Sequence, residues 1–293
     1  MHSYLKAIGF SSVNTRMDLD KIIGLVMDQP TEKNSSKISR IEAITEIKRD
    51  FADGMGVAVR GTYDEKGFFH LEHYFPYYRG NAVTAKEDII INKRVDTDAY
   101  TGMCDDVRLG VSLIFYLQNS IDYIESKGLE ETSRVMPLTL TGLSTEGKII
   151  LGLDSNEKKM KHKQAEIKQR NQLIAEARAG NQEAIDSLTI DDIDMYAMIS
   201  RRSRVEDVYS IVDTSFIPYG SESDNYSIIG TILSWKLVQN YMTSEEVYQL
   251  FLSCNDINYS ICINKRDLQG EPMVGRRFKG SIWMQGKVDF IEM

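Results

Sequence analysis

Two groups of basic side chains in the second half of the chain could bind an anion. They are Arg201, Arg202 and Arg204, then Arg276, Arg277 and Lys279. Arginine can fork two N–H groups onto a phosphate or a carboxylate, and the glycines that flank the second group permit close approach of the backbone. The pattern predicts an anion or nucleotide site. The alternative is solvated surface charge that pairs with the abundant acidic residues.

A third basic group lies on a helix that we expect over residues 157–170. Its members are Lys158, Lys159, Lys161, Lys163, Lys168 and Arg170. The net charge of −8 opposes a general affinity for nucleic acid, yet this basic helix leaves such binding open. A solvated helix face is the simpler interpretation.

The segment Gly142–Lys148 reads G-x-x-x-x-G-K, as at the start of a phosphate-binding loop. Ile149 stands where that motif needs a Ser or Thr hydroxyl for magnesium. The residues after Lys148 predict a strand, whereas the motif needs the N-terminus of a helix. We therefore expect a hairpin turn rather than a phosphate site.

Residues that could bind a metal are sparse. His70 and His73 are three apart in a predicted strand, so their side chains would point to opposite faces. No cysteine pair has the spacing of a zinc site. Asp105 and Asp106 could face a cleft, although a polar turn before a buried strand is the simpler interpretation. We expect no metal and no cofactor, and the sequence identifies no catalytic residue.

Hydrophobic periodicity predicts helices and antiparallel strands. Thr15 and Asp18 form a capping box before a helix that ends near Pro30, and residues 31–39 read as a loop. Further capping signals at Thr189 and Thr243 predict two more helix starts. The other expected elements are a meander of three strands from residue 41 to 73, a buried strand over 107–117, a short helix over 120–126, a hairpin over 138–153, helices over 155–200, strands over 208–216 and 227–237, a helix over 243–252, and strands over 257–263 and 278–285.

Two β-rich parts of the chain resemble each other. Each has a strand that enters a Pro-Tyr corner, and matching residues recur at nearly constant offsets: Asp105 with Asp224, Gly110 with Gly230, and Gln118 with Gln239. We expect an α+β fold with two β-rich halves, 1–154 and 204–293, joined by a charged helical segment over 155–203. The halves could be a degenerate internal repeat of antiparallel sheets, or their similarity could be chance.

Composition narrows the class of protein. In 293 residues, 42% are hydrophobic and 27% are charged, which is typical of an ordinary globular protein. Three cysteines, Cys104, Cys254 and Cys262, are an odd and sparse set that is typical of a reducing compartment. No segment reads as a signal peptide or approaches the ~20 apolar residues that span a bilayer. We expect a cytoplasmic protein that does not enter the membrane.

The run Asn225-Tyr-Ser-Ile-Ile-Gly230 resembles the D/N-x-S-x-x-G element of PilZ domains, which bind cyclic di-GMP. The resemblance implies ligand contacts by Asn225, Ser227 and Gly230. That family also has an upstream R-x-x-x-R motif, and here Val205 breaks the spacing of the nearby arginines.

Three longer runs carry a resemblance to a second family. Asp191–Tyr196, Glu206–Gly220 and Gly270–Gly280 are similar to an uncharacterised family of clostridial (Firmicutes) bacteria that is catalogued as a domain of unknown function. The resemblance implies a cytoplasmic bacterial protein and supplies no activity.

The leading hypothesis is a non-enzymatic binding or regulatory protein that recognises a protein or a small anionic ligand. The alternatives are a sensor of a cyclic dinucleotide or another phosphate ligand, an enzyme that acts on an anionic or phosphorylated substrate, and an adaptor that pairs through residues 155–200. Convergence of Asp105, Arg276 and Arg277 in one cleft would favour a ligand site or an enzyme, and their separation would favour the adaptor.

Overall fold

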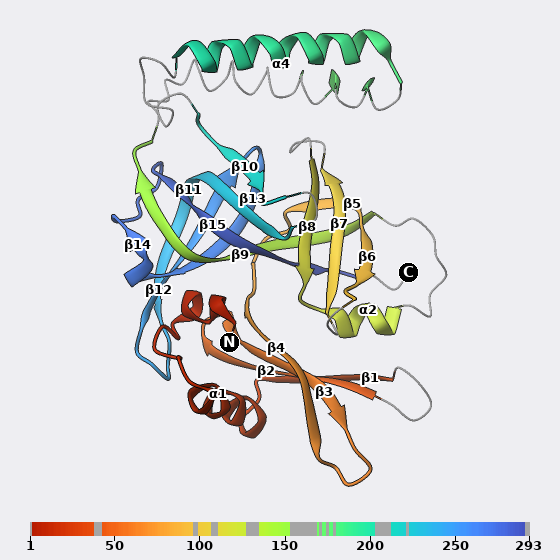
Figure 1. Ribbon diagram of the computed structural model, residues 1–293, viewed down its shortest axis with the longest axis vertical. Coiled ribbons are helices and arrows are strands. Elements are labelled where there is room, and N and C mark those ends of the chain that lie inside the picture. Colours follow the sequence, from red (N-terminus) through yellow and green to blue (C-terminus); the bar gives the residue numbers. More distant parts are fainter. Residues whose placement is uncertain are drawn as a thin grey trace.

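The fold is α+β and is dominated by two β-sheets (Figure 1). The computed structural model describes residues 2–37, 43–95, 99–106, 111–126, 135–152, 169, 172–173, 176–177, 180–202, 212–220 and 223–290. One sheet has four strands and the other has eleven. The expected fold class is confirmed.

The chain begins with a 3-10 helix, η1 (Ser3–Ile8), and the helix α1 (Arg16–Asp28). The predicted capping box is confirmed, because the Thr15 hydroxyl accepts the backbone N–H of Asp18 while the Asp18 carboxylate accepts the N–H of Thr15. Leu19, Ile22 and Val26 are buried. The apolar stripe of α1 therefore packs onto the core as its spacing requires.

The four-stranded sheet is an antiparallel meander, and the three predicted strands are confirmed. Its strands are β1 (Glu32–Lys37), β2 (Ala43–Ala52), β3 (Met55–Tyr63) and β4 (Phe69–Tyr78). The prediction of a loop over 31–39 was wrong, because β1 pairs with β2 from Glu32↔Lys48 to Lys37↔Ala43. β1 lies at the sheet edge, where polar side chains are favoured, so it has no hydrophobic alternation to recognise.

The large sheet takes strands from both sides of residue 154. They are β5 (Ala85–Asp88), β6 (Ile90–Lys93), β7 (Tyr100–Asp106), β8 (Val111–Leu117), β9 (Val135–Ile150), β10 (Ser215–Pro218), β11 (Asn225–Gln239), β12 (Glu246–Cys254), β13 (Ile257–Asn264), β14 (Leu268–Gln269) and β15 (Arg277–Val288). The division into halves remains a prediction, and the internal repeat is not confirmed.

Five strands of this sheet close into a ring. β11 pairs with β12, β12 with β13, β13 with β9, β9 with β15, and β15 returns to β11. The β13–β9 pair is parallel and the other four are antiparallel. Tyr226, Ile228, Leu252, Ile261 and Phe278 belong to the buried cluster of this ring. We call this unit the barrel.

Two predicted elements of the barrel were wrong. The predicted hairpin over 138–153 is one continuous strand, β9, which includes Gly147. Glycine is required there because a Cβ would be 2.4 Å from the Phe278 ring. The helix over 243–252 is strand β12, and the Thr243 hydroxyl accepts Glu245 N–H in a turn instead of capping a helix. Long-range pairing therefore overrides the local signals at both places.

The helices outside the barrel are α2 (Ser120–Ser126), η2 (Lys265–Asp267) and α4 (Gln182–Arg202). α2 confirms a prediction. The Asn181 side chain accepts the N–H groups of residues 183 and 184 at the start of α4. The helix start at Thr189 was wrong, since its hydroxyl bonds the Ile185 carbonyl inside α4. The basic helix over 157–170 lies outside the described residues, except for residue 169.

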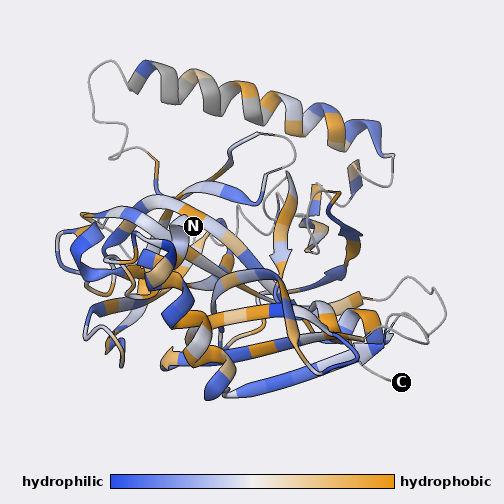
Figure 2. Cartoon of the chain, turned by 60° about the horizontal axis from the view of Figure 1, so that its bottom comes forward, coloured by the Kyte–Doolittle hydropathy of each residue, from blue (hydrophilic) through white to orange (hydrophobic). Residues whose placement is uncertain are grey.

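α4 lies apart from the strands in Figure 1 and carries hydrophobic residues along its length (Figure 2). Ile190 and Ile193 are exposed, at 59% and 62%. No helix in the described part of the chain is long and apolar enough to cross a membrane.

A second buried cluster lies between the four-stranded sheet and the outer face of the barrel. Phe51, Val57 and Phe75 come from the sheet, and Leu143 and Trp283 come from the barrel. η1 and α1 contribute to the same cluster. We call this junction the seam.

Candidate interaction surface

Strand β11 continues well beyond its pairing with β15. Thr231 is the last paired residue and faces Arg277 on one side and Ser253 of β12 on the other. Ile232 still donates its N–H to the Arg276 carbonyl (2.8 Å) and accepts the N–H of Gly275 (2.9 Å). Residues 234–239 then pair with β12 alone. Within the described chain, the opposite edge of residues 233–239 has no backbone partner, so the barrel wall is open there.

The open edge carries exposed apolar side chains. Trp235 faces Leu250 and Leu237 faces Tyr248 across the β11–β12 ladder. Leu250 and Tyr248 belong to the barrel core, whereas Trp235 and Leu237 are 43% and 38% exposed. The two side chains thus extend the core-facing side of β11 past the point where the wall ends. The Trp235 ring meets the Tyr248 ring nearly edge-on at 5.8 Å.

Further apolar residues continue this surface at both ends. Leu233 lies at the bulge in β11. Met273 and Val274 lie in the loop before Arg276, which is bonded to Ile232. Tyr241 and Met242 lie in the turn that follows Gln239. We call the whole surface the apolar strip, and its exposed members are Leu233, Trp235, Leu237, Tyr241, Met242, Met273 and Val274. Single exposed hydrophobic residues are normal, but a contiguous group marks an interaction site.

Two basic residues border the apolar strip and differ in their partners. Lys236 forms an ion pair with Asp53 (2.5 Å) in the turn between β2 and β3. Arg276 is half-buried and donates to the Glu271 carbonyl (3.2 Å). Among the described residues, no carboxylate lies within ion-pair distance of Arg276. One cation is therefore neutralised at the strip, and the other is available to an incoming carboxylate.

Arg277, one of the predicted ligand residues, has its guanidinium bonded to backbone carbonyls. Arg277 is 3% exposed, and its guanidinium donates to the carbonyls of Leu151 (2.9 Å), Val212 (2.6 Å) and Asp213 (3.3 Å). Leu151 precedes the helical segment and Val212 follows it. Arg277 therefore fastens both chain ends of that segment to the barrel.

The other predicted ligand residues fall into separate places. Asn225, Ser227 and Gly230 lie on β11, and Lys279 lies on the adjacent strand β15, opposite Ile229. The structure brings these four onto neighbouring strands. Arg201 and Arg202 end α4, which lies apart from the strands in Figure 1, and Arg204 lies outside the described residues. The predicted PilZ-like role of these residues is not tested.

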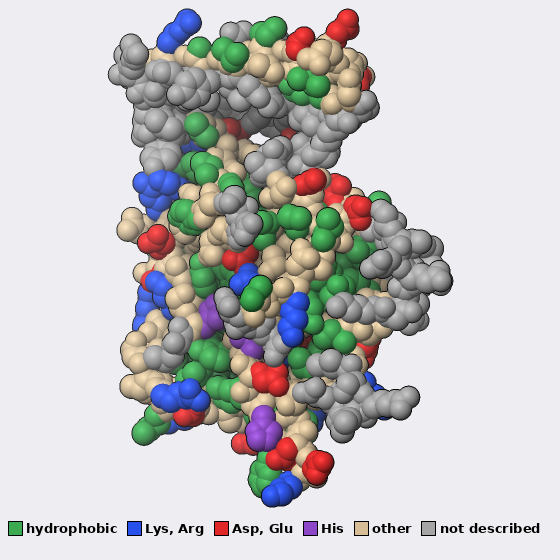
Figure 3. All heavy atoms as spheres, turned by 45° about the vertical axis from the view of Figure 1, so that its right-hand side comes forward, with side chains coloured by type: hydrophobic (Ala, Val, Ile, Leu, Met, Phe, Trp, Pro, Cys, Tyr) green, Lys and Arg blue, Asp and Glu red, His purple; other side chains and the backbone are tan. Residues whose placement is uncertain are grey.

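Asn225 also belongs to a polar and aromatic cluster at the seam. It accepts a hydrogen bond from the Tyr4 hydroxyl (2.6 Å), and the Tyr4 ring stacks on Trp283 at 5.4 Å. Trp283 Nε1 donates to Asp224 (3.0 Å), which also pairs with Arg94. Figure 3 shows histidine side chains near the middle of this face of the molecule, with basic side chains beside them.

Three side chains at the seam, His2, Tyr4 and Tyr116, keep one protonation state near neutral pH. Burial, together with the nearby charge of His73, lowers the pKa of His2 to about 4. Burial, then Asp224, raises the pKa of Tyr4 to about 12. Burial likewise raises the pKa of Tyr116 to about 12. A general acid or base works best with a pKa near the operating pH, so these groups are suited to packing and hydrogen bonding.

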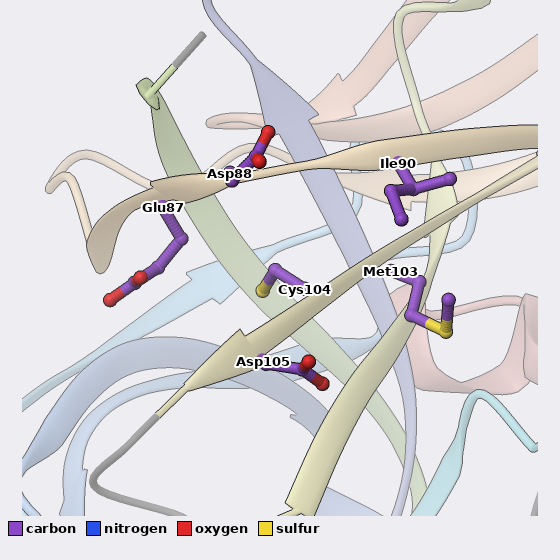
Figure 4. Close-up of a pocket in the computed structure, with 6 residues that line it drawn as sticks. All are labelled: Glu87, Asp88, Ile90, Met103, Cys104 and Asp105. Carbon is purple, nitrogen blue, oxygen red and sulfur yellow. The ribbon is translucent and has the colours of Figure 1, made fainter. Parts of the chain in front are cut away.

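A pocket of about 260 Å³ lies near the edge of the large sheet, on β5, β6 and β7 (Figure 4). Its lining residues are Glu87, Asp88, Ile90, Met103, Cys104 and Asp105. The carboxylates of Glu87, Asp88 and Asp105 point in different directions in Figure 4, and Asp105 accepts the Ser112 hydroxyl (2.5 Å). Within the described residues, no group of three or more His, Cys, Asp or Glu could hold a metal.

Asp105 was predicted to lie in a polar turn, and it lies instead in β7, opposite Ser112 of β8. Arg277 bonds three backbone carbonyls and Arg276 bonds the Glu271 carbonyl. The pocket that Asp105 lines is not lined by Arg276 or Arg277, so the described residues do not place all three in that cleft, an arrangement that favours an adaptor.

A protein-family model matches residues 5–286 of the chain. Its description is "Domain of unknown function, E. rectale Gene description (DUF3881)". Comparison with curated proteins and with solved structures found no match.

Proposed function

The chain belongs to the DUF3881 family, and we propose that it is a non-enzymatic protein-binding protein that recognises its partner through the apolar strip. The observation that carries the proposal is the exposure of Trp235 and Leu237 at the open edge of the barrel. Their neighbours on β12 are core residues, so a partner at the strip would complete a surface that is elsewhere buried. Tryptophan and tyrosine often supply most of the binding energy at protein interfaces.

The hydrogen-bond partners and pKa values of the charged and titratable groups support partner binding over catalysis. The Arg277 guanidinium is occupied by backbone carbonyls, and the pKa values of His2 and Tyr4 lie far from neutrality. The strip, in contrast, offers apolar side chains for contact, among them Trp235 and Leu237. We place this activity in the cytoplasm as part of the proposal, because Cys104, Cys254 and Cys262 are buried free thiols, as a reducing compartment allows.

Selection from a random peptide library displayed on phage tests the proposal. The full chain and its Trp235→Ser variant are used as parallel baits, and Phe68→Ser is the matched control. Phe68 is 66% exposed in the turn between β3 and β4, outside the apolar strip. We expect peptides enriched on the wild type and the control to be lost on Trp235→Ser, with Tm unchanged in all three. Equal enrichment on all three baits, or none on any, would overturn the proposal.

A further inference from the structure

We propose that the partner binds as an extended strand added to the open edge of β11, and that it ends in a carboxylate held by Arg276. This inference rests on the proposed function and names the chemistry of the partner. An exposed sheet edge is a template for a strand from another chain, because its N–H and C=O groups lack partners.

The open edge is long enough for such a strand. Residues 233–239 pair with β12 on one side only, and a strand rises about 3.3 Å per residue. An added segment of about seven residues would therefore span about 23 Å along β11. Bonds to alternate residues of β11 would align it, as in any antiparallel ladder.

The side chains of β11 specify an alternating partner sequence. Trp235 and Leu237 lie on the side of β11 that continues the barrel core. Lys236 lies between them and bonds Asp53 of the four-stranded sheet. A partner strand would meet an apolar surface with every second residue and a polar one with the residues between. Such a pattern belongs to a strand and does not suit a helix.

The charge at the end of the open edge sets the direction of the added strand. β15 runs antiparallel to β11 and begins at Arg277. The residue before it, Arg276, accepts the Ile232 N–H with its backbone carbonyl. A second antiparallel strand, placed in line ahead of β15, would finish at Arg276. Within the described chain, the Arg276 guanidinium has no carboxylate partner and donates to the Glu271 carbonyl. Its guanidinium can thus receive a terminal or side-chain carboxylate.

The probe is a fluorescein-labelled peptide of alternating threonine and valine that ends in glutamate with a free carboxyl group. Its affinity for the full chain is measured by fluorescence anisotropy. Two N-methylated forms block alternate sets of peptide N–H groups, so only one of them removes the donors that face β11. We expect that form to bind at least about tenfold more weakly and the other to bind as the parent does.

Arg276→Gln tests the carboxylate. We expect it to weaken the free-acid peptide by about tenfold and to leave an amidated peptide that ends in glutamine unchanged. Arg266→Gln is the matched control, because Arg266 lies on η2 and is paired with Glu245. Hydrogen exchange of the β11 amides gives a second readout, in which alternate amides of residues 233–239 become protected when the peptide is bound.

Three results would overturn the inference: equal loss of affinity in both methylated forms, no effect of Arg276→Gln, or self-association of the chain through β11 that the peptide cannot displace. The failure of this inference is separable from that of the proposed function. If library peptides depend on Trp235 but tolerate methylation of either set of N–H groups, the chain binds proteins by side chains alone. If no library peptide depends on Trp235, the proposed function fails.

Discussion

Arg60 and Glu46 face each other across strands β3 and β2, and both side chains are enclosed at the seam, with exposures of 0% and 2%. Arg60 also donates to the Gln118 carbonyl (3.0 Å) and lies 4.6 Å from the centre of the Phe75 ring. Burial alone would raise the pKa of Glu46, but Arg60 and Lys48 hold it below its ordinary value. Two sheets thus meet around a paired charge.

Glu46→Gln should destabilise the protein strongly. The change leaves the Arg60 charge buried without its counterion, which costs about 3–5 kcal/mol. Urea unfolding measures the effect, and Glu65→Gln in the exposed turn between β3 and β4 is the control. The double variant that combines Glu46→Gln with Arg60→Met should lose less stability than the single change, because no lone charge remains. A loss below about 1 kcal/mol for Glu46→Gln would contradict this account.

His2 should make stability depend on pH in a window of its own. Its pKa falls from 6.5 in the unfolded chain to about 4 in the fold, so the unfolded state binds a proton first. Stability is therefore complete above pH 6.5 and declines as the pH falls toward 4, by about 3 kcal/mol. The Glu46 contribution is present above its ordinary pKa of 4.5 and is lost below it, so it affects a lower range.

His2→Phe isolates this effect. Phenylalanine retains the ring beside Trp283, 4.7 Å away in the wild type, and cannot be protonated. The variant should lose about 3 kcal/mol less than the wild type between pH 7 and pH 4 in urea unfolding. His70→Gln is the control, since His70 is a 63% exposed side chain beside Asp64. If the free energy of unfolding of the wild type and of His2→Phe depends on pH in the same way, the His2 imidazole is not buried in its neutral form.

Local signals predicted local structure, and long-range pairing decided the rest. The Thr15 and Asp18 capping box requires only neighbouring residues and was predicted correctly. The signal at Thr243 resembles it, yet β12 pairs with β11 and β13 over its whole length, and these ladders outweigh a single cap. Gly142 and Gly147 suggested a turn because nothing in the sequence reveals Ile282 and Phe278, the side chains that require glycine there.

The interaction surface could be predicted in part. The strand that carries Trp235 and Leu237 was predicted over 227–237 and is found as β11. Its exposure could not be predicted, because it depends on where β15 begins relative to Thr231. The acceptors of Arg277 could not be predicted for a similar reason: Leu151 and Val212 are distant from it in sequence. A glycine-flanked arginine can serve a ligand or the fold, and only the acceptors distinguish the two.

Gly9→Ala should be more costly than the same change at Gly67. Both glycines have positive φ, +88° and +81°. A Cβ at Gly9 would lie 2.9 Å from Asn240 Cβ, whereas one at Gly67 meets nothing within 4 Å. Asn240 cannot move freely, because its side chain donates to the Ile8 carbonyl and accepts the Met242 N–H. We expect about 1 kcal/mol at Gly67 and about 2–3 kcal/mol at Gly9 from thermal unfolding. Equal losses would mean that backbone strain alone is responsible.

Arg277→Leu should loosen the attachment of the helical segment to the barrel. The substitution removes the donors to the carbonyls of Leu151 and Val212, and a buried carbonyl without a partner costs about 1–3 kcal/mol. Amide exchange near Leu151 and Asp213 should accelerate at least about tenfold. Arg201→Leu, at an exposed position on α4, should leave the exchange of both regions unchanged.

Arg277→Lys distinguishes charge from geometry at the same position. One ammonium group cannot reproduce the planar fork that reaches carbonyls on two separate chain segments. Compared with Arg277→Leu, lysine should therefore restore protection from amide exchange on at most one side, near Leu151 or near Val212. Amide exchange on the other side should stay fast. Full restoration on both sides would show that a positive charge is sufficient. Arg277 would then be an electrostatic anchor, and its bonds to both segments would not be needed to hold the ends of the helical segment.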